Sequence, residues 1–286
     1  MKNASCLIAA LLACAGCGSS PALAPIAAAP AAATPVAGGG APAGWKLVWS
    51  DEFDKDGLPD PAKWAYDSDR NRAGWHNNEL QYYAVERLEN TRVQNGKLII
   101  TARRERLASA PDYGGQAYTS GRLFTKGRAE WTYGYMEIRA KLPCAVGTWP
   151  AIWTLGSSGS WPEMGEIDIM EHVGQKKGEL LGSIHTKAYN WPANTQKTVR
   201  IQQDDVCDVF HNYQLRWEAD RLAVGIDDRY YFEFKNPGDG DNAKWPFSKP
   251  QYLLLNLAIG GDLGGPVNDK MLPALFEIDY VRIYQP

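Results

Sequence analysis

Three carboxylates stand close together in residues 165–172, where the sequence reads GEIDIMEH. Because side chains alternate along a strand, Glu166 and Asp168 share one face, and the isoleucines point to the other. Glu171 falls on the wrong face of a regular strand. One extra residue, a β-bulge at 169–170, would return Glu171 to the face of the other acids, and bulges are common beside active sites. The spacing therefore predicts a bulged strand that gathers three acids.

Such a cluster could carry out acid–base chemistry. Like charges a few ångströms apart resist simultaneous ionisation and push their pKa values apart. One carboxyl then stays protonated as an acid, while its neighbour stays ionised as a nucleophile or base. Glycoside hydrolysis needs such a pair, and a separation of about 5–5.5 Å between the carboxyls gives retention of configuration. The alternatives are an acidic strand edge that faces solvent and part of a calcium site.

The flanking sequence favours the enzymatic interpretation. Residues 165–171 closely resemble the active-site strand of glycoside hydrolase family 16, in the longer, bulged form of its laminarinase-type members. The resemblance implies that Glu166 is the nucleophile, Asp168 the assisting acid and Glu171 the general acid/base. It implies a retaining endo-β-glucanase that hydrolyses β-1,3 bonds in laminarin-like polysaccharides and needs no cofactor for catalysis.

The resemblance covers nearly the whole chain after residue 44. It extends from about Trp45 to Tyr284 and includes the stretches 148–153, 256–261 and 278–282. One departure lies at a sugar subsite, where Asp262 and Leu263 stand in place of the Asn-Trp pair of many laminarinase-like members. Linkage preference is therefore less secure than reaction type. The alternatives are a mixed-linkage β-1,3-1,4-glucan (lichenan) or galactan hydrolase, a glucan transglycosylase and a lectin-like glucan-binding module, because a fold alone does not fix function.

The pattern of elements predicts an all-β fold. Short alternating or apolar runs recur with turn signals between them, and no long stretch has helical periodicity. This pattern is typical of a β-jelly-roll sandwich of two antiparallel sheets, with an open concave cleft that favours attack within a polymer. The expected strands are 45–49, 92–101 (a hairpin), 118–123, 135–142, 147–156, 165–172, 182–186, 210–217, 222–226, 230–234, 253–261 and 276–284.

Further residues are candidates for sugar binding. Eleven tryptophans supply flat apolar faces with polar tips, which suit packing on sugar rings, although cores use them as well. The sequence favours a sugar platform for Trp149 and leaves Trp153 open between platform and core. Arg139 joins the candidates because the resemblance places its strand face in the cleft. The predicted substrate-binding residues are Asn78, Arg122, Trp149, Trp153, His185, Trp191 and Asn256.

The N-terminus reads as an export signal. Residues 1–17 hold one positive charge, a short apolar core and small residues. The apolar core is too short to span a bilayer permanently. Cys14 and Cys17 both end segments that resemble lipoprotein cleavage boxes, and Cys17 is favoured for lipidation. Residues 18–43 are nearly all Ala, Pro and Gly and predict a tether before a catalytic domain at 44–286. We expect an outer-membrane or cell-surface lipoprotein, or a secreted protein after ordinary cleavage.

The charge balance limits the partners. The formal net charge is −3, and no basic run is present, which argues against nucleic acid or anionic lipid as a partner. We expect a β-glucan as the partner, contact with a membrane only through the lipid anchor, and a monomer.

Two cysteines, Cys144 and Cys207, lie outside the signal region. In an exported protein a disulfide is the simplest interpretation, and two buried free thiols are the alternative. The four histidines, at 76, 172, 185 and 211, show no metal-ligand spacing.

The family resemblance also implies a structural calcium ion on the convex side. By matching position its ligands would be the Glu52 carboxylate, the Gly96 carbonyl and Asp279. Calcium prefers six to eight oxygens, so waters or further carbonyls would be needed. The alternative is that these acids cap turns without a metal.

Overall fold

A computed structural model describes residues 36–37 and 40–286. The predicted signal at 1–17, with Cys14 and Cys17, and nearly all of the predicted tether at 18–43 lie outside the described residues. Among the described residues, no helix has the length and apolar character that crossing a membrane requires.

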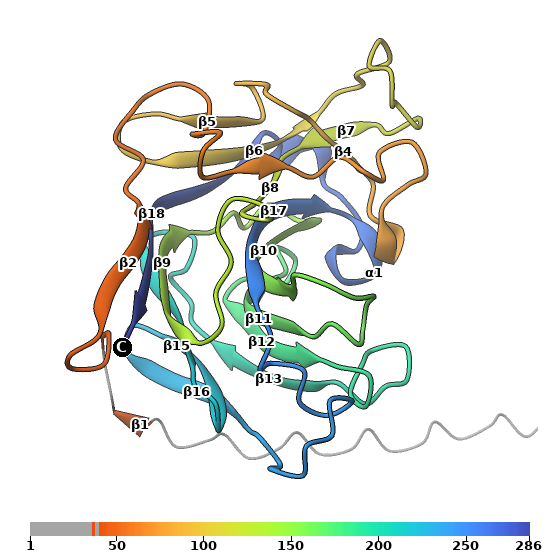
Figure 1. Cartoon of the computed structure of the whole chain (residues 1–286). Coiled ribbons are helices and arrows are strands. Elements are labelled where there is room, and N and C mark those ends of the chain that lie inside the picture. Colours follow the sequence, from red (N-terminus) through yellow and green to blue (C-terminus); the bar gives the residue numbers. More distant parts are fainter. Residues whose placement is uncertain (1–35, 38–39) are drawn as a thin grey trace, which may run out of the picture. The chain divides into compact units, whose positions relative to one another are not determined.

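The described chain forms two β-sheets (Figure 1). The first has eleven strands, and nine of them follow one another along the sheet. Their order is β1 (Val36–Ala37), β16 (Arg229–Lys235), β15 (Arg221–Ile226), β14 (His211–Trp217), β9 (Gly134–Lys141), β18 (Ala274–Gln285), β6 (Leu98–Arg104), β7 (Tyr118–Ser120) and β4 (Gln81–Tyr83). In addition, β2 (Lys46–Asp51) pairs with β18, and β5 (Thr91–Val93) pairs with β6.

The second sheet has seven strands and carries the acidic strand near its middle. Their order is β13 (Lys197–Gln202), β12 (Glu179–His185), β11 (Glu166–His172), β10 (Thr148–Gly156), β17 (Gln251–Ile259), β8 (Arg122–Phe124) and β3 (Ala65–Tyr66). Three short helical turns lie in loops, namely η1 (His76–Asn78), α1 (Gly261–Gly264) and η2 (Asp269–Met271).

The core contains apolar side chains from both sheets. Met136 and Ile138 of β9 belong to the same buried cluster as Ile152 of β10 and Ile167 of β11. These residues alternate with polar or aromatic neighbours on the same strands, as a sheet with one core-facing side requires. Each strand of the seven-stranded sheet therefore has a second face turned away from this core. We call that side of the sheet the catalytic face.

The predicted all-β jelly-roll fold is confirmed, and most of the predicted strands are present. The hairpin turn between β5 and β6 has positive φ angles at Asn95 (54°) and Gly96 (68°), as expected for Asn-Gly. Asp227 and Asp228 form the turn between β15 and β16 in the same way, with φ of 46° and 64°. One pairing differs from the expectation, because β4 and β7 are parallel.

Two expectations about strands were wrong. The single strand expected at 118–123 is divided at Gly121, where the chain passes from β7 in one sheet to β8 in the other. A side chain at Gly121 would collide with Thr91, so the crossing needs a glycine. The strand with Arg139, β9, belongs to the eleven-stranded sheet, so Arg139 does not share a sheet with the acids. Arg139 pairs with Asp279 of β18 instead. The local pattern around Arg139 could not show which sheet its strand joins, because that depends on strands far away in the sequence.

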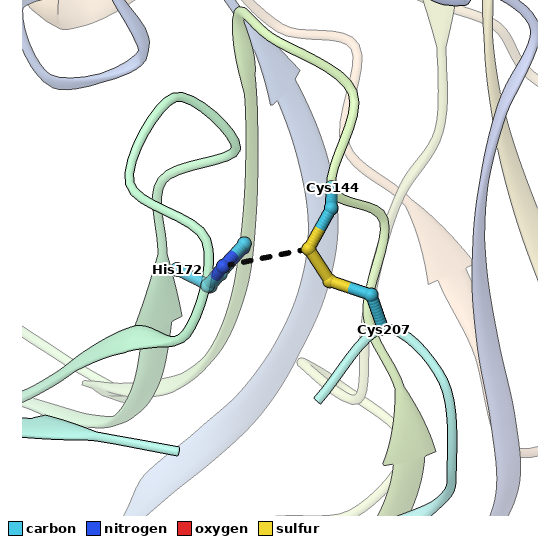
Figure 2. Close-up of side chains that lie close together, drawn as sticks. All are labelled: Cys144, His172 and Cys207. Carbon is cyan, nitrogen blue, oxygen red and sulfur yellow. Dashed lines mark hydrogen bonds between the residues drawn. A yellow bond between two sulfur atoms is a disulfide. The ribbon is translucent and has the colours of Figure 1, made fainter. Parts of the chain in front are cut away.

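The disulfide predicted between Cys144 and Cys207 is confirmed, and it joins two segments 63 residues apart (Figure 2). His172, the last residue of β11, lies against it, with Nε2 3.9 Å from the Cys144 sulfur. The His172 ring is fully buried, and its Nε2 also accepts a hydrogen bond from Gly178 N at 3.2 Å. Burial lowers the pKa of His172 to about 4, so the ring is neutral. The disulfide thus packs beside the residue that follows Glu171.

Candidate active site

The three acids lie together on the catalytic face because β11 contains the predicted bulge. Asp168 pairs with Ser183 of β12, whereas Glu171 pairs with Leu181. Three steps on β11 therefore match two steps on β12, and one residue is extra. The residues between the two acids, Ile169 and Met170, are fully buried in the core. The bulge turns Glu171 to the side of Asp168, as the sequence predicted.

Each acid has a specific neighbour. The Trp161 indole N–H donates to Glu166 Oε2 at 2.6 Å. The Trp149 indole N–H donates to Glu171 Oε1 at 3.0 Å. The Asp168 carboxylate lies 3.3 Å from His185 Nε2, and His185 is directly opposite Glu166 in the pairing of β11 with β12. Hydrogen bonds to a charged group are stronger than neutral ones, so the indoles hold the two glutamates in place.

Burial is the main cause that raises the pKa of every acid in the cluster. It raises the pKa of Asp168 well above its usual value, and the nearby charge of Glu171 adds to this. It also raises the pKa of Glu166, with Asp168 as the second cause, and the pKa of Glu171, with Glu166 adding. The Trp161 and Trp149 hydrogen bonds act in the opposite direction. The cluster therefore retains a proton at pH values where isolated carboxyls would be ionised.

A hydrogen-bond chain fixes the second tryptophan of β10. Trp153 Nε1 donates to Asn256 Oδ1 at 2.7 Å, and Asn256 Nδ2 donates to the Tyr83 hydroxyl at 3.0 Å. The Tyr83 hydroxyl in turn donates to Glu79 Oε2 at 3.4 Å. Asn256 uses both ends of its amide in this chain and so positions the Trp153 ring. Its predicted direct contact with sugar stays a prediction.

Arg122 of β8 completes this part of the catalytic face. Its guanidinium lies between two indole rings, 5.0 Å from the centroid of Trp75 and 4.8 Å from that of Trp153. Its Nε is 2.7 Å from Asp67 Oδ2, and both side chains are largely buried. Cation–π contacts and a shielded ion pair give this group little freedom. Arg122 therefore supports the face of Trp153 that it covers.

Two predicted sugar ligands lie in loops. Asn78 Nδ2 donates to Asp262 Oδ1 at 2.7 Å, which joins η1 to α1. Asp262 is the residue at which this sequence departs from the laminarinase-type pattern. Trp191 follows β12 in the loop before β13 and is 50% exposed. The sugar contacts of Asn78 and Trp191 stay predictions.

Both carboxylates among the predicted calcium ligands are paired with arginines. Glu52 accepts two hydrogen bonds from Arg282, at 3.0 and 2.9 Å, and this contact lowers the pKa of Glu52. The Asp279 carboxylate is 2.5 Å from Arg139 Nη1. As these side chains lie, the donor set does not fit calcium, because the ion would have to displace two guanidinium groups. The calcium site, including the Gly96 carbonyl, stays a prediction.

Sequence reasoning missed two residues of this site. Trp161 contacts Glu166 from the loop that precedes β11, and its position five residues before an acid was a usable signal. Glu79 is partly buried, and burial raises its pKa. No local pattern predicts that Glu79 lies close enough to Arg122 for that charge to lower its pKa.

The comparisons with known proteins agree with this geometry. Residues 78–282 match the family described as glycosyl hydrolases family 16. A "Beta-glucanase" of Rhodothermus marinus is 47% identical over 252 residues, which cover 84% of this chain and 85% of the relative.

Two solved structures are similar as well. One is SCLam, described as a non-specific endo-β-1,3(4)-glucanase, with 52% identity, a TM-score of 0.86 and coverage of 89% of this chain and 96% of that one. The other is the laminarinase from Rhodothermus marinus, with 48% identity, a TM-score of 0.79 and coverage of 84% and 97%. A match of this extent, together with the three acids on the bulged β11, shows that the chain belongs to glycosyl hydrolases family 16.

Proposed function

We propose that this protein is a retaining endo-β-glucanase that hydrolyses β-1,3-glucosidic bonds in laminarin-like polysaccharides. The observation that carries the proposal is the bulge of β11, which places Glu166, Asp168 and Glu171 on one face of the sheet. The similarity to a β-glucanase and a laminarinase of Rhodothermus marinus supports the choice of substrate.

In the proposed reaction, Glu166 and Glu171 have different roles. Glu166 attacks the anomeric carbon, and Glu171 protonates the oxygen of the leaving sugar, which yields a covalent glycosyl-enzyme. Glu171, now ionised, removes a proton from water, and that water releases the sugar with its original configuration. The Trp161 N–H stabilises the charge on Glu166 before attack, and the Trp149 N–H orients Glu171.

Asp168 controls where the retained proton lies. Burial raises the pKa of Asp168 well above its usual value, so Asp168 is protonated at pH values where a free carboxyl would be ionised. A protonated Asp168 no longer opposes the ionisation of Glu166 by its charge. Glu166 then reaches the ionised state that attack requires, although burial alone would keep it protonated.

A second specificity also has a specific observation in its favour. SCLam, which is similar over nearly its whole length, is described as non-specific toward β-1,3(4)-glucans. In this chain Asp262 and Leu263 follow two glycines beside β10, and Asp262 binds Asn78. Cleavage of mixed-linkage β-1,3-1,4-glucan is therefore the alternative to strict β-1,3 cleavage.

The test is the release of reducing sugar from laminarin, barley β-glucan and agarose. We expect release from laminarin by the wild-type protein, and near-background release by Glu166→Gln. Faster release from barley β-glucan would favour the mixed-linkage alternative. Binding of glucan without release from any of the three would instead indicate a lectin-like module, and longer products than the substrate supplies would indicate a transglycosylase.

The proposal extends to how the protein is placed outside the cell. Its N-terminal sequence supports export, with lipid attachment at Cys17 and the catalytic domain held on the tether of residues 18–43. The expected oligomeric state is a monomer. Labelled palmitate should enter the wild-type protein and the Cys14→Ala variant, but not Cys17→Ala. Label in Cys17→Ala would contradict the assignment, and light scattering of the purified protein measures its oligomeric state.

A further inference from the structure

Two carboxylates, one of them the proposed nucleophile, and one imidazole converge on the catalytic face. One ligand atom from each of Glu166, Asp168 and His185 lies within 4.8 Å of the other two. They come from two adjacent strands, β11 and β12, with Glu166 directly opposite His185. The spacing of histidines along the sequence could not reveal this group, because its imidazole and its carboxylates lie 17 or more residues apart.

One atom of this group has an unused acceptor position. Asp168 is 3% exposed, and its Oδ2 has no hydrogen-bond partner among the described residues. This oxygen points at the imidazole, 3.3 Å from His185 Nε2. A buried carboxylate oxygen without a well-aligned donor is uncommon, because its lost hydration is not fully replaced. A bound cation would take the place of the proton that the cluster retains, because metal ligands must be deprotonated, and it would satisfy Asp168 Oδ2.

The spacing suits a small divalent ion that accepts nitrogen as well as oxygen. Zinc binds imidazole nitrogen and carboxylate oxygen at about 2.0–2.2 Å, so two of its tetrahedral ligands lie roughly 3.4 Å apart. Asp168 Oδ2 and His185 Nε2 are 3.3 Å apart, close to this length, and Glu166 contributes an oxygen that lies within 4.8 Å of both. Calcium and magnesium prefer oxygen ligands alone, so the imidazole favours zinc or copper.

The other metal-like group of the described residues is different. Cys144, His172 and Cys207 also bring their ligand atoms together, but the two sulfurs are bonded to each other in the disulfide (Figure 2). A disulfide offers no thiolate, and thiolates are what zinc binds. The group beside Glu166 is therefore the one that is open to an ion.

We propose that Glu166, Asp168 and His185 form a binding site for zinc or a chemically similar divalent ion, and that the ion and the glucan exclude one another. The ion would occupy the carboxylate that attacks the sugar, so binding of the metal is inhibitory. Substrate in the site would in turn cover Glu166 and prevent metal binding. External zinc or copper would thus act as a reversible competitor of the glucan.

Calorimetry with zinc chloride in a non-chelating buffer tests the site. We expect one ion per molecule of the purified protein, and no comparable binding of magnesium chloride. His185→Gln should weaken zinc binding by more than about tenfold, since even the loss of an outer-shell partner typically costs 10–100-fold. The matched control is His76→Gln, which removes an exposed imidazole from η1 and should bind zinc like the wild type.

A second arm uses only the wild-type protein, so it does not depend on the folding of a variant. Saturating laminari-oligosaccharide should weaken zinc binding, and zinc should raise the KM for laminarin while leaving kcat unchanged. No zinc binding up to millimolar concentration, equal binding by His185→Gln and wild type, or binding unaffected by the oligosaccharide would each overturn the proposal. Calorimetry detects the ion whether or not the protein hydrolyses laminarin, so a failure here is distinct from a failure of the proposed activity.

Discussion

The indole N–H of Trp161 donates a 2.6 Å hydrogen bond to Oε2 of Glu166, the carboxylate assigned as the nucleophile. Trp161 comes from the loop before β11, and its ring also lies 6.1 Å from that of His185. This donor lowers the pKa of Glu166, against the effect of burial. A residue outside the acid motif therefore helps to set the charge of the nucleophile.

Replacing this donor should change the pH dependence of catalysis. In Trp161→Phe the charged form of Glu166 loses a hydrogen bond of about 1.5–3 kcal/mol, so the pKa of Glu166 should rise. We expect the acidic limb of the kcat/KM profile on laminarin to move to higher pH, with activity below the optimum reduced about tenfold or more. Trp245→Phe is the control, because Trp245 Nε1 has no partner in the described part of the chain. An unshifted acidic limb in Trp161→Phe would show that the bond is unimportant.

The raised pKa of Asp168 should make the free energy of unfolding depend on pH. Its pKa is raised in the folded state, so the native protein holds a proton that the unfolded chain has released once the pH exceeds about 3.8. Stability from this group is therefore present at low pH and is lost as the pH rises. Asp168→Asn cannot ionise and should escape this loss.

We expect Asp168→Asn to raise the melting temperature at pH 8 by roughly 2–4 °C, the shift that about 1 kcal/mol produces in a domain of this size. At pH 4 the variant and the wild type should melt together. Asp208→Asn, which alters an exposed carboxylate beside Lys177, is the matched control. An equal effect of Asp168→Asn at both pH values would mean that its ionisation is not the cause.

The disulfide should contribute substantially to stability. It closes a loop of 63 residues, for which the chain-entropy model gives about 4 kcal/mol. The double variant Cys144→Ala/Cys207→Ala should therefore melt roughly 8–16 °C lower than the wild type, at about 2–4 °C per kcal/mol. A reductant should lower the wild-type melting temperature similarly and leave the variant unaffected. A variant that melts like the oxidised wild type would contradict this estimate.

The bond between Asn78 and Asp262 provides a test of how the two loops cooperate. Asn78→Asp alone would place two carboxylates at hydrogen-bond distance and should raise the KM for laminarin several-fold, because like charges repel. The double variant Asn78→Asp/Asp262→Asn exchanges the two groups and should recover most of the loss. Additive effects of the two single changes would show that the pair does not act as a unit.

Much of the site could be predicted because it depends on local periodicity. Alternation along β11 placed Glu166 and Asp168 on one face, and the count of residues required a bulge before Glu171. Trp149 and Trp153 are four residues apart in a regular part of β10, so they lie on one face of the strand.

What could not be predicted depends on contacts between distant segments. The division of 118–123 at Gly121 and the position of Arg139 in the other sheet follow from the partners that β8 and β9 find, which no local pattern specifies. Trp161 reaches Glu166 because of the path of its loop. Glu79 forms an isolated β-bridge with the distant Gly260. The arginine partners of Glu52 and Asp279 are tertiary contacts as well.

The assignment of Glu166 and Glu171 is tested most directly by adding azide to variants that lack one carboxylate. With an activated β-glucoside, Glu171→Ala should form the glycosyl-enzyme on Glu166, and azide should then release the β-glucosyl azide. Glu166→Ala cannot form that intermediate, so azide should attack directly and yield the α-glucosyl azide. NMR of the two products distinguishes the anomers. The account predicts β from Glu171→Ala and α from Glu166→Ala, and the reverse pattern would contradict it.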